Sequence, residues 1–201
     1  MPLNSNPHKS NPVLTTFVSV LGLGLTLINS PLAIGEMVNP TLIASQPQAA
    51  TVTGKDGQYI AKIVVNSSAD KTWKVLTDYN NFYQFLPNVI SSKVLKTQGN
   101  QKIFEQIYQV QALIFKQQTR VRIASTETYP KEIDFKLVDG DLKALQGSWK
   151  IQPISAQQIL IEHQVKVDPG STPSLSLFYS IYENSLKQTL EAIKKETEHR
   201  N

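Results

Sequence analysis

His163 is the residue whose type and position best suit chemistry in this chain. It lies between Ile161 and Val165, in a segment where apolar residues alternate with Glu162 and Gln164. Since the apolar members of an alternating strand face the core, we expect His163 to point inward with them. A buried neutral imidazole offers one donor and one acceptor, so it could bond a ligand carbonyl or act as a base. The competing interpretation is a core histidine satisfied by a tyrosine or by a backbone carbonyl.

Two more polar side chains share the inward register of another expected strand. Gln117 and Thr119 alternate there with Gln118 and Arg120. A few polar groups in an apolar pocket commonly orient a ligand. A solvated cavity mouth explains the same two residues equally well.

Several kinds of catalytic site are excluded by the composition. The chain has no cysteine, so it has no disulfide, no thiolate nucleophile and no thiolate metal site. Its three histidines, His8, His163 and His199, are too scattered to indicate a zinc centre. It contains neither a Gly-x-Ser-x-Gly nor a His-Glu-x-x-His pattern. We therefore predict no catalytic residue, no metal and no cofactor.

A long C-terminal helix is expected to cover the inward-facing residues. Large side chains recur at steps of three or four between residues 172 and 198, at Leu175, Phe178, Tyr182, Leu186, Leu190 and Ile193. Thr172 is expected as the N-cap, with Pro173 in the first helical position. Burial of the six side chains contributes on the order of 10–18 kcal/mol in gross terms. A wide apolar surface must therefore receive this helix.

Segments of period-two alternation supply that surface. Residues 57–65 form the first expected strand, and short helices follow at residues 68–77 and 82–86. Six more strands then follow between residues 89 and 167, and short loops join them, which predicts an antiparallel meander. The expected fold class is α+β, with a seven-stranded curved antiparallel sheet around the long C-terminal helix and two short helices between strands 1 and 2.

Three stretches carry a resemblance to a known family. Residues 68–79 resemble a first helix with its exit turn, residues 82–87 a short second helix with a following proline, and Gly147-Ser148-Trp149 the glycine and aromatic residue of a sixth strand. In this order they resemble the helix-grip fold of the START-like (SRPBCC) superfamily. The branch it is most similar to is the polyketide cyclase/dehydrase and coenzyme-Q-binding-like group. The resemblance covers about residues 55–198.

The resemblance implies a deep apolar cavity between the sheet and the C-terminal helix. Together with the inward registers it gives a set of candidate ligand-binding residues: Phe85, Phe104, Tyr108, Phe115, Gln117, Thr119, Phe135, Trp149, His163, Phe178 and Tyr182. The implied function is binding or transport of a hydrophobic small molecule such as a quinone, an isoprenoid, a lipid or a polyketide. The alternatives are a polyketide cyclase or dehydratase that uses the same cavity, and a ligand-free interaction module whose aromatic residues simply fill the core.

The N-terminal segment points to export or to membrane attachment. No residue between Lys9 and Glu36 is charged, and residues 13–28 form an apolar run. Residues 1–34 are therefore expected to be a signal peptide or a membrane anchor, residues 35–54 a linker and residues 55–199 the folded domain. The protein would then be exported, to the periplasm or an equivalent lumen, or anchored to a membrane.

The charge pattern is compatible with a surface that contacts a membrane. The net charge is +4, which is well short of a nucleic-acid-binding composition, so no nucleic acid partner is expected. Basic side chains share the outward registers of the strands, at Lys116, Arg120, Arg122, Lys136, Lys150 and Lys166. They could contact an anionic membrane surface, or they could simply be solvated.

Overall fold

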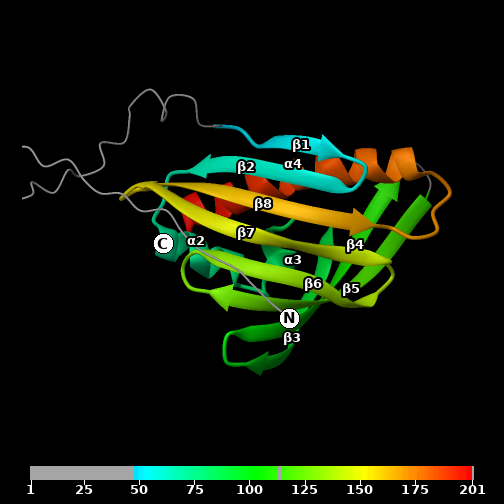
Figure 1. Cartoon of the computed structure of the whole chain (residues 1–201), viewed down its shortest axis with the longest axis horizontal. Coiled ribbons are helices and arrows are strands. Elements are labelled where there is room, and N and C mark those ends of the chain that lie inside the picture. The colour runs from blue at the N-terminus through cyan, green and yellow to red at the C-terminus, as the bar shows by residue number, and fades with distance from the viewer. Residues whose placement is uncertain (1–47, 113–114, 201) are drawn as a thin grey trace, which may run out of the picture. The chain divides into compact units, whose positions relative to one another are not determined.

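Eight strands form one antiparallel sheet in the computed structural model, which describes residues 48–112 and 115–200, without the side chains of residues 110–116. The strands are β1 (Thr51–Lys55), β2 (Gln58–Val65), β3 (Val89–Gln98), β4 (Gln101–Ala112), β5 (Phe115–Thr128), β6 (Glu132–Gly140), β7 (Ala144–Ser155) and β8 (Gln158–Asp168). Their spatial order is β1-β2-β8-β7-β6-β5-β4-β3. Consecutive strands from β3 to β8 are therefore neighbours, and the β1–β2 hairpin pairs with β8 (Figure 1).

The helices of the described residues all lie on one side of the sheet. They are α2 (Ala69–Leu76), α3 (Phe82–Phe85) and α4 (Leu175–His199). Figure 1 looks onto the outer face of the sheet, so that α4 runs behind β2 and β8. The α+β helix-grip arrangement expected from the alternation and the long amphipathic segment is confirmed.

β1 is the strand that the sequence interpretation missed, so the sheet has eight strands and not seven. It begins at Thr51, within the segment assigned to a linker, and four of its five residues are exposed. An edge strand of this kind is held mainly by its backbone ladder to β2, which leaves little hydrophobic periodicity to detect. The expected signal or anchor segment lies outside the described residues. Among those residues, no helix is both long and apolar enough to cross a membrane.

α4 begins two residues later than expected. Ser174, not Thr172, is the N-cap, because its Oγ accepts a hydrogen bond from the N–H of Leu177 at 3.3 Å. Pro173 consequently lies before the helix and not in its first turn.

Burial along α4 is strongly uneven. Leu186, Leu190 and Ile193 are 6%, 0% and 3% exposed, whereas Leu175 is 51% exposed and Leu177 is 57% exposed. The expectation that Leu175 belongs to a buried stripe is therefore wrong. Periodicity places a residue on one face of the helix, but the reach of the opposing sheet decides how far along that face burial extends.

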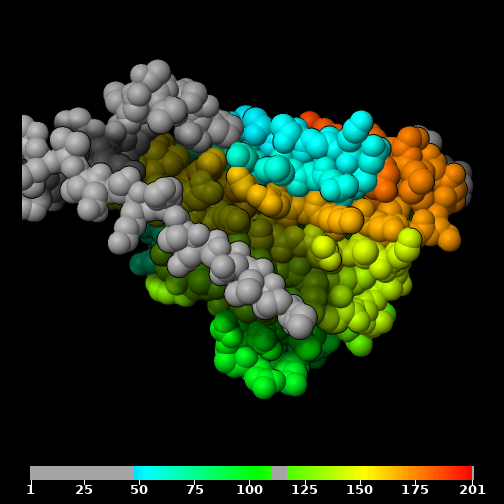
Figure 2. Space-filling model, viewed as in Figure 1, coloured from blue at the N-terminus to red at the C-terminus, as the bar shows by residue number. Residues whose placement is uncertain are grey.

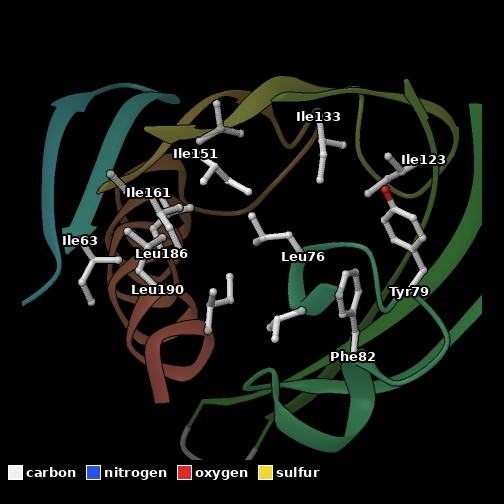
Figure 3. Close-up of a cluster of buried hydrophobic side chains, with 14 of the residues drawn as sticks. Ile63, Leu76, Tyr79, Phe82, Ile123, Ile133, Ile151, Ile161, Leu186 and Leu190 are labelled. Atoms are coloured by element: carbon white, nitrogen blue, oxygen red, sulfur yellow. The ribbon is translucent and has the colours of Figure 1, made fainter. Parts of the chain in front are cut away.

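The core joins the C-terminal half of α4 to the sheet and to the two short helices. Figure 3 shows side chains from these elements pointing toward one another. Those labelled there come from β2, α2, the turn between α2 and α3, α3, β5, β6, β7, β8 and α4: Ile63, Leu76, Tyr79, Phe82, Ile123, Ile133, Ile151, Ile161, Leu186 and Leu190.

Polar contacts fix the same half of α4 to the end of β2. Lys194 Nζ donates to the carbonyl oxygen of Val64 at 2.6 Å. Glu198 Oε1 accepts from the backbone N–H of Asn66 at 2.9 Å. α4 is therefore anchored at its C-terminal end, while its first turns have few buried side chains.

Candidate functional site

His163 lies on the inner face of the sheet, as its register predicted, and is 5% exposed. Trp149, its partner across β7 and β8, stacks on the imidazole with ring centroids 3.7 Å apart and an interplanar angle of 14°. Phe135 stacks at a centroid distance of 5.5 Å. The backbone carbonyl of Ser148 lies 3.2 Å from Nδ1. These contacts hold the ring in one orientation.

Gly147 makes room for this stack. A Cβ at Gly147 would lie 1.9 Å from the carbonyl oxygen of Gln164 and 2.9 Å from Cζ of Phe135. Gly147 is also the register partner of Phe135 on the adjacent strand. The absence of a side chain on β7 therefore lets the ring of Phe135 lie across the strand toward His163. This explains why a glycine precedes Trp149 by two positions.

A second aromatic group lies under the first turns of α4. Tyr182 stacks on Phe178 at a centroid distance of 5.8 Å and is tilted against Tyr59 of β2 at 6.0 Å. Burial, followed by repulsion from the phenolates of Tyr108 and Tyr59, raises the pKa of Tyr182. The phenol of Tyr182 therefore lies within electrostatic reach of one phenol on β2 and of another on β4. Phe178, Tyr182 and Tyr108 are only half-buried.

Phe85 and Phe104 belong to a different part of the molecule. Phe104 is 5% exposed and stacks on Tyr79 at 4.4 Å. Phe85 packs edge-on against Phe82 at 5.8 Å, and the guanidinium of Arg200 lies 5.8 Å from its ring centroid. These contacts match the alternative interpretation, in which aromatic residues fill the core between α2, α3 and the sheet.

The remaining candidates lie on β5. Gln117 is exposed and Thr119 is half-buried, so of the two only Thr119 has a side chain that is partly enclosed. The side chain of Phe115 lies outside the described residues. The structure thus brings Phe135, Trp149 and His163 together in one group. Tyr108, Phe178 and Tyr182 form a second group, so the candidates do not all lie at one site.

Two residues of the inner face were not among the candidates. Tyr59 is 4% exposed and contacts Tyr182, and Gln106 is 3% exposed and accepts a hydrogen bond from the hydroxyl of Tyr108 at 3.1 Å. Both could have been found from register alone. Tyr59 alternates inward with Ala61, and Gln106 falls between Phe104 and Tyr108. Gln106 was overlooked because the candidates were chosen mainly among large apolar residues.

The titratable groups of the inner face are held in their neutral forms. Burial lowers the pKa of His163 to about 3, although the hydrogen bond to Ser148 opposes that shift. Burial raises the pKa of Tyr108 to about 12. At neutral pH the imidazole is therefore unprotonated and the phenols keep their protons. Within the described parts of the chain, no cluster of three or more His, Cys, Asp or Glu residues could hold a metal ion.

A hollow of about 680 Å³ opens on the other, outer face of the sheet, over β1, β2, β8, β7 and β6. Its lining includes Gln58, Gln146, Lys136 and Lys166, which lie in one row across four strands. Figure 2 views this face, with β2 in cyan beside β8 in orange. The hollow is distinct from the expected cavity between sheet and α4, which stays a prediction.

Ion pairs occupy part of the expected basic surface. Arg122 Nε lies 2.7 Å from Glu105 Oε2, and Arg120 Nη1 lies 2.8 Å from Asp139 Oδ2. Lys150 pairs with a carboxylate of β6 at 3.4 Å. These partners reduce the positive charge that a membrane would meet. Contact with an anionic membrane surface stays a prediction.

Comparison with characterised proteins gives a partial sequence match. The ribosome association toxin RatA of Escherichia coli (strain K12) is 28% identical over 99 residues, which are 49% of this chain and 60% of that protein. The corresponding toxin of Shigella flexneri matches equally well. The chain thus spans about 60% of the length of the curated relatives it matches.

Solved structures match over a larger share of the chain. A STAR-related lipid transfer protein from Xanthomonas axonopodis has a TM-score of 0.61 at 17% identity, and the match covers 74% of this chain and 98% of that one. The Zhui aromatase/cyclase from a Streptomyces species has a TM-score of 0.61 at 13% identity, with 71% and 94% covered. At these identities the likeness establishes the fold alone.

The family follows from a match to residues 65–194, which is more than half of the chain. That match includes the Gly147–Trp149 stretch and His163, and it extends from the end of β2 into the last turns of α4. The chain belongs to the polyketide cyclase / dehydrase and lipid transport family, within the START-like SRPBCC superfamily.

Proposed function

We propose that this protein binds a hydrophobic small molecule between the inner face of the sheet and the first turns of α4, as a carrier. The observation that carries the proposal is the uneven burial of α4. Its C-terminal half is closed against the sheet, with Leu190 at 0% exposure, while Leu175 and Leu177 are more than half exposed. Phe178 and Tyr182, which lie between these regions, are half-buried.

Half-buried aromatic side chains on an inner face favour a ligand over a closed core. Each such ring leaves apolar surface that gains about 25 cal/mol for every Å² removed from water. A hydrophobic ligand placed beside Phe178, Tyr182 and Tyr108 would cover that surface. Leu175 and Leu177 would then lie at the entrance. Quinones, isoprenoids, lipids and polyketides all have the required apolar surface, and the names of the structural neighbours are consistent with this range.

The protonation states support a carrier over a cyclase or dehydratase. A general acid or base is most effective when its pKa lies near the working pH. The pKa of His163 is about 3 and that of Tyr108 is about 12, so neither group exchanges a proton readily at neutral pH. Both groups instead suit fixed hydrogen bonds to a bound molecule.

Native purification tests the proposal directly. The full chain is purified without detergent and extracted with organic solvent, and the extract is analysed by mass spectrometry against an extract of an unrelated protein. We expect a co-purifying hydrophobic compound. The emptied protein should then bind the neutral fluorescent probe N-phenyl-1-naphthylamine with saturation. An empty extract together with no saturable probe binding would refute the proposal and favour the ligand-free interaction module.

A pair of tyrosine variants locates the site. Tyr182→Ala removes a ring from the inner face and should weaken probe binding several-fold. Tyr83→Ala is the matched control, since Tyr83 lies on α3 and is 49% exposed. Equal losses of affinity in the two variants would place the probe elsewhere on the protein.

The uncharged N-terminal run supports a further proposal, that the protein works outside the cytoplasm or at a membrane. Fractionation of cells that express the full chain would test it. Recovery of the full-length protein only in the cytosolic fraction would contradict it.

A further inference from the structure

The hydrogen bond between His163 and Ser148 determines which ring nitrogen carries the proton. A backbone carbonyl oxygen can only accept, so the contact of 3.2 Å to the Ser148 oxygen requires a proton on Nδ1. Burial keeps the imidazole neutral, and a neutral imidazole has one N–H group only. Nε2 therefore has a free lone pair and can accept a hydrogen bond but cannot donate one.

The surrounding rings prevent His163 from exchanging the roles of its nitrogens. Trp149 stacks on one side at 3.7 Å, and Phe135 lies at 5.5 Å. A flip of the imidazole would break the bond to Ser148 and would require both aromatic rings to move. The residues around His163 therefore keep Nε2 unprotonated, so that it acts as a hydrogen-bond acceptor.

Nε2 is the unused acceptor of this imidazole ring. None of the described residues donates to Nε2. An acceptor on a residue that is only 5% exposed is stabilised when a ligand brings a hydrogen-bond donor to it.

We propose that the ligand carries a hydroxyl group that donates a hydrogen bond to Nε2 of His163. This inference rests on the proposed binding function and narrows its ligand class to hydroxylated hydrophobic compounds, such as phenols, quinols, sterols or reduced polyketides. A ligand that offers only carbonyl or ether oxygens at this position would place two acceptors against each other. The expectation that His163 bonds a ligand carbonyl is therefore replaced by a bond to a ligand hydroxyl.

Two probes that share a ring system, of which one has a hydroxyl donor and the other a methyl ether, test this inference. 2-Naphthol and 2-methoxynaphthalene share one ring system, but only the naphthol can donate a hydrogen bond. Their affinities for the full chain are measured by competition with N-phenyl-1-naphthylamine. A site without an acceptor would favour the more apolar ether, so a preference for the naphthol is the expected and discriminating result. One net hydrogen bond corresponds to roughly a two- to tenfold preference.

His163→Phe supplies the comparison, because it keeps an aromatic ring beside Trp149 and Phe135 but removes the acceptor. The preference for 2-naphthol, expressed as a ratio of affinities, should fall by the same two- to tenfold factor. His199→Phe is the matched control, since His199 is exposed near the end of α4, and it should leave the ratio unchanged. His163→Gln retains an acceptor oxygen and should keep part of the preference. It also provides the comparison if His163→Phe fails to fold.

Long-range ¹H–¹⁵N correlation spectra of the histidine side chains provide a readout without ligand. They should show His163 in the Nδ1–H form. An Nε2–H form would overturn the inference even if probes bind. Equal ratios in the wild type and in His163→Phe would also overturn it while leaving the binding function intact. Absence of saturable binding by both naphthalene compounds and by the fluorescent probe would refute the binding function itself, and the inference with it.

Discussion

Replacement of Gly147 by alanine tests the reasoning about how the His163 site is built. The new methyl group would lie 1.9 Å from the carbonyl oxygen of Gln164, whereas real Cβ contacts are essentially never shorter than 3.0 Å. β7 and β8 would therefore have to separate locally by at least about 1.1 Å, the difference between these two distances. The same methyl group would meet Cζ of Phe135 at 2.9 Å and push its ring away from His163.

The energetic cost follows from the hydrogen-bond ladder between the two strands. An N···O distance near 2.9 Å that lengthens by about 1 Å no longer supports a hydrogen bond. Two or three ladder bonds around the Gly147–Val165 pair would be lost, at about 1 kcal/mol each, and displacement of the Phe135 ring adds to this. Gly147→Ala should therefore lower the free energy of unfolding by about 3 kcal/mol.

Urea denaturation monitored by tryptophan fluorescence measures this loss. Gly99→Ala is the control, since Gly99 has a φ of +58° but nothing lies within 4 Å of the position that a methyl group would take there. It should cost only about 1 kcal/mol, from backbone strain. A Gly147→Ala variant that is no less stable than Gly99→Ala would refute the claim that close approach requires glycine at this position.

Three further predictions concern stability. Arg200→Ala removes an ion pair to Asp78 at 2.8 Å and the contact with the ring of Phe85, so it should lower the free energy of unfolding by about 1 kcal/mol, and Arg200→Lys should recover part of this. The pKa of His163 is about 3 in the fold and about 6.5 in the unfolded chain, so only the unfolded chain gains the proton as pH falls from 6.5 toward 3. The free energy of unfolding should therefore drop by about 2 kcal/mol between pH 7.5 and pH 5, and His163→Phe should lack that part of the loss in urea titrations at the two pH values. A chain that begins at Gln48 should unfold cooperatively with a free energy within about 0.5 kcal/mol of the full chain, and failure to fold would show that earlier residues belong to the fold.

Register was the most informative property for the candidate site. Alternation placed His163 and Trp149 on the inner face of adjacent strands, and the structure shows them stacked. Residue type was a poorer guide, because it selected Phe104, a core residue, and passed over Gln106, which bonds Tyr108. An inward position is a local property of a strand, whereas the neighbour across the interior depends on how the whole sheet curves.

On the outer face of the sheet, register likewise predicted where charged side chains lie but not which of them form ion pairs. Six basic residues on outward registers suggested a cationic surface, but Arg122 and Arg120 have carboxylate partners on β4 and β6. Glu105 and Asp139 stand on the same face as these arginines. The sequence showed the sign of each side chain, and the pairing of strands decided which charges neutralise one another.

The alternation and spacing of apolar residues predicted the order of the elements, the inner face of most strands and the amphipathic nature of α4. These properties depend on periods of two and of about 3.6 residues, which can be read from the spacing of apolar residues in the sequence. That spacing did not predict the edge strand β1, since backbone hydrogen bonds to β2 hold that strand and its side chains are mostly exposed. The burial of Leu190 and the exposure of Leu175 could be seen only in the folded protein, because burial depends on how far the sheet extends along the helix. The proton of His163 could likewise be assigned to Nδ1 only in the folded protein, since the assignment depends on a carbonyl group of the neighbouring strand, 15 residues earlier in the chain.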